Sequence, residues 1–164
     1  MKRFVTLILV MASVAAWSQT QLPAWATEKF KVFSGKYVVS SYIKPQFLEA
    51  DLSGSKKTDV AIAIERKVDK KKGILILFAG SDKSFLVGAG NMFGKAGDDF
   101  EWANTWSIFR EKTTFETTFK PNGDVGNGKE VKLDRPGIEI REEEGAGGII
   151  YFDGKKFIWI HQGD

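Results

Sequence analysis

The amino-acid sequence predicts an α+β fold, in which one N-terminal helix packs on a predominantly antiparallel β-sheet. Segments rich in β-branched and aromatic residues recur from residue 36 onward, and turn-forming residues separate them. A single short helical pattern precedes these segments. The chain of 164 residues can bury one good core but is too short for two ordinary domains. We therefore expect a single domain over residues 19–164.

The N-terminus has the pattern of a cleavable secretory signal peptide, residues 1–18. Lys2 and Arg3 precede an apolar run from Phe4 to Ala16, which suits a signal and is short for a membrane span. Ala16 and Ser18 place small side chains where signal peptidase requires them. Cleavage is predicted after Ser18, with cleavage after Ala16 as the alternative. The protein is expected to be periplasmic or secreted, with no membrane span after cleavage.

Charge and composition exclude several classes of function. The signal carries Lys2 and Arg3 and no acid, so the mature chain is close to neutral and has no electrostatic footprint for nucleic acid. The chain contains no cysteine, which excludes disulfides, a lipoprotein anchor and a cysteine-based metal site. His161 is the only histidine and no G-x-S-x-G motif occurs. No catalytic residues are predicted, and an enzymatic role is not favoured.

The first elements after the signal are a helix and two short extended pieces. The helix is predicted from about Pro23 to Phe33, because proline suits a first helical turn and Gly35 provides a stop. A strand is predicted at Tyr37–Ile43, where β-branched and aromatic residues concentrate. Pro45 interrupts it, and Phe47–Leu52 is the second extended piece.

Residues 60–88 predict a β-meander. Val60–Ile64 is an almost continuous apolar run, as expected of a strand that is covered on both faces. A polar turn at Lys70–Gly73 leads into apolar strands at Ile74–Phe78 and Phe85–Val87. The glycine-rich segment that follows, residues 90–106, predicts a loop.

The C-terminal half predicts further strands and a hairpin. Threonine pairs favour a strand at Ile108–Phe119, and Val131–Leu133 and Ile138–Ile140 alternate at the strand period. Two apolar runs, Ile149–Phe152 and Lys156–His161, flank Asp153-Gly154. Asp-Gly between two apolar runs predicts a hairpin with a type I′ turn.

The segment Asp51–Asp59 reads D-L-S-G-S-K-K-T-D and leads into the apolar strand at Val60. It resembles the calcium loops of FG-GAP and VCBS-type repeats and, more loosely, EF-hand and dockerin loops. In those loops oxygens at alternate positions converge on the ion, and a glycine permits the sharp turn. The resemblance implies that Lys57 supplies a backbone carbonyl ligand and that Gly54 takes the tight turn. It also implies four side-chain ligands, Asp51, Ser53, Ser55 and Asp59.

The loop also departs from this pattern. Serines stand at two positions that usually carry carboxylates or amides, Lys56 and Lys57 add positive charge, and Ile62 replaces the bidentate glutamate of an EF-hand. Calcium is the one cofactor implied, and its Kd would be weak, about 10⁻⁴–10⁻³ M. The alternative is an Asx-type turn, in which Asp51 and Asp59 accept loop N–H groups and no metal binds.

A longer resemblance covers the C-terminal segment, residues 137–164. Together with the upstream D-L-x-G loop, it is similar to small exported bacterial proteins of unknown function. The resemblance implies a shared fold and compartment and no particular activity.

Trp102 and Trp106 are the candidate ligand-binding residues, together with the nearby acids Asp99 and Glu101. The two tryptophans are four residues apart and could form a stacking platform for sugar rings or a peptide. The alternative for both indoles is core packing.

The function expected from these features is an exported, non-enzymatic binding or interaction module for a protein partner or an envelope polymer. One alternative is a cell-envelope or polysaccharide hydrolase that uses Asp99 or Glu101 with Glu143, since glycoside hydrolysis needs two carboxylates facing one cleft. The other is an inhibitor or immunity protein for an exported enzyme.

Overall fold

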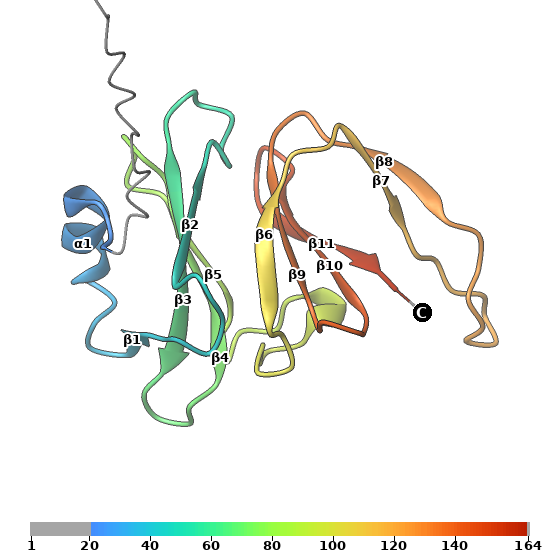
Figure 1. Cartoon of the computed structure of the whole chain (residues 1–164), viewed down its shortest axis with the longest axis horizontal. Coiled ribbons are helices and arrows are strands. Elements are labelled where there is room, and N and C mark those ends of the chain that lie inside the picture. Colours follow the sequence, from blue (N-terminus) through green and yellow to red (C-terminus); the bar gives the residue numbers. More distant parts are fainter. Residues whose placement is uncertain (1–20, 164) are drawn as a thin grey trace, which may run out of the picture.

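A computed structural model describes residues 21–163 of the chain (Figure 1). The predicted signal peptide, residues 1–18, and both candidate cleavage sites lie outside the described residues. Neither helix in the described part has the length and apolarity to cross a lipid bilayer. The described elements, in chain order, are α1 (Ala24–Phe30), β1 (Tyr37–Val39), β2 (Phe47–Ala50), β3 (Asp59–Arg66), β4 (Lys72–Leu77), β5 (Ser84–Gly88), the 3₁₀ helix η1 (Gly94–Ala96), β6 (Thr105–Phe109), β7 (Thr113–Glu116), β8 (Lys129–Lys132), β9 (Gly137–Arg141), β10 (Gly147–Phe152) and β11 (Phe157–Gln162).

The strands form three sheets, where the sequence predicted one. In the first sheet the order is β1-β3-β4-β5, and β2 also pairs with β3. The order in the second sheet is β11-β10-β9-β6, and β7 pairs with β8 in a separate ribbon. All pairs within these sheets are antiparallel, and β3, β4 and β5 form the predicted meander. The predominantly antiparallel architecture with one short α-helix is therefore confirmed.

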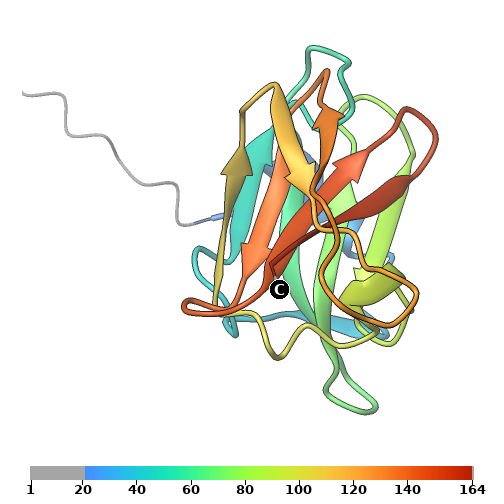
Figure 2. The same cartoon turned by 90° about the vertical axis from the view of Figure 1, so that its right-hand side faces the viewer.

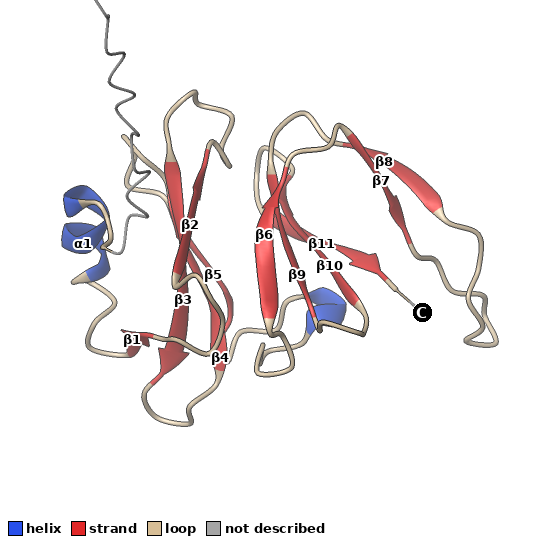
Figure 3. Ribbon diagram, viewed as in Figure 1, coloured by secondary structure: helices blue, strands red, loops and turns tan. Residues whose placement is uncertain are grey.

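The elements stack in four layers: α1, the first sheet, the second sheet and the β7–β8 ribbon (Figure 1, Figure 3). Turned by 90°, the ribbon lies in front of the second sheet (Figure 2). Three apolar clusters fill the spaces between layers. The middle cluster, here called the inter-sheet core, joins side chains of both sheets, including Ala61, Ala63, Ile74, Ile76, Ile138, Ile140 and Ile150.

Strand β3 shows why both faces of the first sheet are apolar. Val60, Ile62 and Ile64 pack in one cluster with Ala26 of α1, while Ala61 and Ala63 belong to the inter-sheet core. All five β3 side chains are fully buried. Burying one large aliphatic side chain contributes about 1.5–3 kcal/mol, so this strand anchors two layers at once.

Several predicted elements end too late. The strands predicted to reach Ile43 and Leu52 end at Val39 and Ala50. Helix α1 stops at Phe30, and turns continue the chain to Lys36. The single strand predicted at Ile108–Phe119 is wrong, because the chain leaves the second sheet after Phe109 and begins the ribbon at Thr113. The three residues between are charged and exposed, so they separate two strands that belong to different sheets.

The C-terminal hairpin is confirmed, but its predicted turn type is wrong. Phe152 pairs with Phe157, so four residues connect β10 and β11. Of these, only Gly154 has a positive φ, whereas a type I′ turn requires two. Asp153 instead shapes the turn with its side chain, since its Oδ1 accepts the N–H groups of Lys155 and Lys156 at 2.8 and 2.9 Å.

Candidate functional site

Two adjoining hollows lie where η1 packs against β11. Their volumes are about 360 and 310 Å³, and both are lined by Lys95, Trp159 and His161. Trp102 completes the wall of the smaller hollow. We call this surface, defined by Lys95, Trp102, Trp159 and His161, the tryptophan groove. Its volumes lie in the range of small-ligand sites, which bind with apolar walls and a few polar groups.

Glycine residues hold the Trp159 indole in place. A Cβ atom at Gly148, on the neighbouring strand β10, would lie 2.4 Å from Trp159 Cζ2. The indole therefore occupies the space that a side chain at this position of β10 would need. On the other side, Gly94 of η1 has a φ of +54°, and its Cβ would lie 3.4 Å from Trp159 Cβ. The close approach of β10 at Gly148 thus restricts the indole, while η1 contacts the base of the same side chain.

Trp102 packs edge-to-face against Trp159. The ring centroids are 6.3 Å apart and the planes are inclined at 79°. Trp102 Nε1 donates to the carbonyl of Ala96 at 3.2 Å, and Trp159 Nε1 donates to His161 Nδ1 at 3.4 Å. Both indole N–H groups are thus used inside the protein. The two half-buried tryptophans offer a ligand their ring surfaces rather than hydrogen-bond donors.

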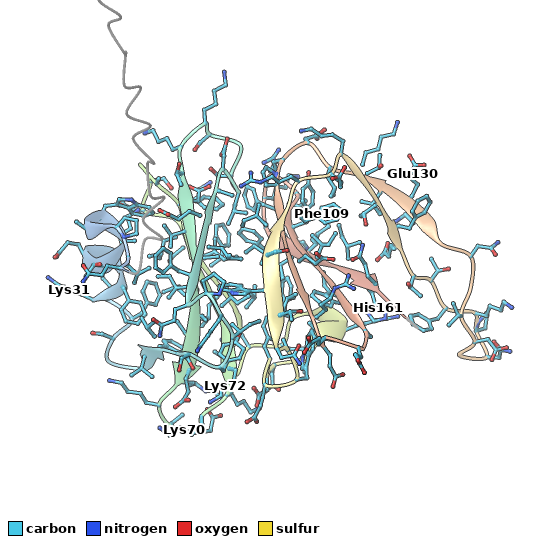
Figure 4. The ribbon with its side chains drawn as sticks, in the orientation of Figure 1. Lys31, Lys70, Lys72, Phe109, Glu130 and His161 are labelled. Atoms are coloured by element: carbon cyan, nitrogen blue, oxygen red, sulfur yellow. The ribbon has the colours of Figure 1, made fainter. Side chains whose placement is uncertain are left out.

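Charged groups of both signs surround the rings. Lys95 Nζ lies 3.7 Å from the ring centroid of Phe119. The Phe119 centroid lies 5.6 Å from that of His161, which is labelled in Figure 4. Glu116 and Glu142 contribute carboxylates to the walls of the larger and the smaller hollow respectively. Burial, and secondly the positive charge of Lys95, lower the pKa of His161 below its ordinary 6.5, and Glu116 opposes this effect.

The predicted platform of Trp102 and Trp106 is wrong. Trp106 is only 6% exposed, faces the inter-sheet core from β6, and donates its Nε1 hydrogen to Pro45 O at 2.7 Å. Core packing, the alternative considered for both tryptophans, holds for Trp106. The partner of Trp102 is Trp159, which sequence reasoning did not place in a site. The sequence did contain a signal for this site. Trp159 and His161 are two residues apart and so share one face of a strand, and Gly147 and Gly148 of the paired strand leave space beside them.

The acidic residues near Trp102 stabilise a loop. Asp99 Oδ1 accepts the N–H groups of Lys72 at 2.8 Å and Glu101 at 3.1 Å, which ties residues 98–101 to the start of β4. Glu101 is exposed, and neither acid is among the described residues that line the groove. Glu143, the partner considered for a hydrolase, lies in the exposed turn between β9 and β10.

The Asp51–Asp59 loop is built around its two carboxylates. Asp59 is completely buried, and its two oxygens accept Ser53 N–H at 2.7 Å and Ala79 N–H at 2.8 Å. Asp51 Oδ2 accepts Lys56 N–H at 2.8 Å. Three of the four carboxylate oxygens therefore already accept backbone N–H groups. The carboxylates thus satisfy loop N–H groups, as the alternative predicted, but none of these bonds reaches the N–H two residues on that defines an Asx turn.

The other predicted ligands and their surroundings do not suit calcium either. The Ser53 and Ser55 hydroxyls bond each other at 2.9 Å, and the Lys57 side chain lies against Gly80. Arg135 brings a permanent cation to the loop, since its Nη1 donates to Ser53 O at 2.9 Å. Within residues 21–163 no three acidic or histidine side chains converge as metal ligands. The geometry fits a loop held by its own carboxylates better than a calcium site, and calcium binding is untested.

Comparison with known proteins does not change this description. No protein family, no curated protein and no solved structure matches the chain significantly. The resemblance to small exported proteins therefore stays a prediction, and a function has to be argued from the geometry of the groove.

Proposed function

We propose that the protein is an exported, non-enzymatic binding module that holds a component of the cell envelope in the tryptophan groove. The observation that carries this proposal is the pair Trp102–Trp159. Two indoles in edge-to-face contact, with both N–H groups bonded internally, form the wall of adjoining hollows. A rigid aromatic surface loses little conformational entropy when a ligand binds.

The surroundings of His161 support binding rather than catalysis. In a catalytic triad the histidine is oriented by a carboxylate at one nitrogen and exchanges a proton with the nucleophile at the other. His161 Nδ1 instead accepts the indole N–H of Trp159, and the ring packs beside Phe119. Asp99, the first acid considered for a hydrolase, is bonded to two backbone amides of its own loop.

Export is inferred from the signal pattern in residues 1–18, and it places the groove beside envelope polymers and proteins. Residues 19–164 can therefore be tested by co-sedimentation with washed envelope fragments of the producing bacterium. We expect retention of the wild-type protein, and at least about tenfold weaker retention of Trp102→Ala and Trp159→Ala.

Trp25→Ala is the matched control. Trp25 is also half-buried, but it belongs to α1 and packs against the outer face of the first sheet. This variant makes the same chemical change away from the groove, so its retention should equal that of the wild type. Circular dichroism would show whether each variant is folded. No retention of the wild type, or equal retention of all folded variants, would refute the proposal.

A further inference from the structure

We infer that the ligand of the tryptophan groove is an uncharged saccharide chain. The inference rests on the proposed binding function and specifies the chemistry of its ligand. It follows from three properties of the groove: the ring surfaces it presents, the signs of its charges and the state of the neighbouring strand edge.

The ring surfaces fit a molecule that presents polarised C–H groups. The face of an indole carries the negative part of its quadrupole, so it attracts groups with partial positive charge. The C–H groups on one side of a sugar ring are such groups. Because Trp102 Nε1 and Trp159 Nε1 are bonded to Ala96 O and His161 Nδ1, the ligand meets the faces and not the N–H donors.

The charges that line the groove balance, so they favour neither a cationic nor an anionic ligand. Lys95, which lines both hollows, would repel a cation that approached the aromatic faces. Glu116 and Glu142, one in each hollow, are balanced by Lys95 and by Lys156, which also lines the larger hollow. Two cations and two anions leave the lining of the two hollows without a net charge that would select an ion. An uncharged hydroxyl both donates and accepts a hydrogen bond, so it can pair with the ammonium group, the carboxylates and the imidazole.

An extended peptide would lack its usual mode of attachment here. Peptides that add a strand to a sheet need unpaired backbone groups at the sheet edge. At the groove, the edge of β11 is already occupied, because Thr117 N–H donates to His161 O at 2.9 Å. Gly163 N–H next to it donates to Thr117 Oγ1 at 3.3 Å. A peptide strand could therefore not pair with β11 at the His161 end of the groove, and a ligand there is held by side chains.

The test uses residues 19–164 and the envelope fragments of the co-sedimentation experiment, after three treatments. Periodate cleaves vicinal diols and so opens the saccharide rings that carry them, proteinase K removes proteins, and a salt series from about 50 to about 500 mM screens charges. We expect periodate to lower retention at least about tenfold, and proteinase K and salt to change it less than about twofold. Lys95→Met keeps the length of the side chain and removes its donors, and it should weaken retention without the larger packing change of Trp159→Ala.

The possible outcomes separate this inference from the proposed function. Retention that survives periodate but is lost after proteinase K would identify a protein ligand and overturn the inference, while the binding function would stand. Retention that survives both treatments would overturn it for every saccharide whose rings carry vicinal diols. A loss of more than about tenfold across the salt series would show that the ligand is charged. Absence of retention before any treatment would instead refute the proposed function.

Discussion

At the scale of single residues, the carboxylates of Asp51 and Asp59 illustrate how one motif can serve two purposes. The same alternation of oxygens that binds calcium in extracellular modules can satisfy the backbone of a tight turn. Here Asp59 bridges two segments, Ser53 in its own loop and Ala79 after β4. Its burial and its two amide donors make it a structural acceptor within the fold.

We therefore expect calcium to leave the stability of residues 19–164 almost unchanged. A site with a Kd of about 1 mM would add on the order of 1.4 kcal/mol in about 10 mM calcium, or about 3–6 °C in melting temperature. Because three carboxylate oxygens are already bonded to amides, the expected shift between chelator and calcium is below about 1 °C. A rise of the larger size that disappears in Asp51→Ala would establish the calcium site instead.

His161 should make stability depend on pH. Its folded pKa lies below 6.5, because burial and Lys95 disfavour the imidazolium. The unfolded chain therefore binds the proton more readily, and the stabilising contribution is complete above pH 6.5 and lost as the pH falls through the folded pKa. Relative to His161→Gln, the wild type should lose melting temperature between about pH 8 and about pH 5. An equal difference at every pH would contradict this assignment.

At the scale of elements, the β10–β11 hairpin carries the groove, and glycine at position 148 makes this possible. An added Cβ would lie 2.4 Å from Trp159 Cζ2 and 2.5 Å from Ile160 O. Gly148→Ala should therefore displace the indole and destabilise the fold by about 1–3 kcal/mol. Urea unfolding would measure the loss, and envelope retention should fall with it.

Gly35→Ala is the matched control, since nothing lies within 4 Å of an added Cβ in the turn after α1. Its free energy of unfolding should change by less than about 0.5 kcal/mol. If Gly148→Ala were equally harmless, the indole would have room to move, and the fixed geometry on which the groove depends would be wrong.

The elements themselves were largely predictable because their signals are local. The apolar run at Val60–Ile64 predicts a strand buried on both faces, and Asp153-Gly154 between apolar runs predicts the hairpin. The turn type was missed because the Asp153 side chain competes with the backbone for hydrogen bonds. The break after Phe109 was missed because both threonine pairs lie beyond it and no glycine or proline marks it.

The groove was predicted only in part. Trp102 was recognised, but its partner Trp159 comes from the last strand, and no local pattern relates the two. Their contact depends on how η1, in the connection between β5 and β6, packs against β11. The nearer tryptophan, Trp106, points into the inter-sheet core because β6 pairs with β9. The spacing of tryptophans in the sequence could not show whether Trp106 or Trp159 is the partner of Trp102.

At the scale of the whole molecule, the two sheets share one core. Four phenylalanines meet at one end of this core. Phe78 in the β4–β5 connection and Phe85 of β5 pack against Phe152 and Phe157 of the β10–β11 hairpin, and the ring centroids are 5.0 to 6.0 Å apart. The sequence predicts apolar faces on both sheets, but not which layer covers each face. This is why one sheet was expected and a layered arrangement was found.

A shared core predicts that both sheets unfold together. Trp25 reports on the α1 layer, whereas Trp106 and Trp159 report on the second sheet, so fluorescence of single-tryptophan variants can follow each side in urea. We expect coincident transitions, also in Phe78→Ala, which should lower the free energy of unfolding by about 3–5 kcal/mol. Phe115→Ala on the ribbon, where the side chain is 62% exposed, should cost less than about 0.5 kcal/mol. Separate transitions for the two sides would mean that each sheet is stable alone. The groove depends on the packing of η1 against β11, so it could then open while the first sheet stays folded.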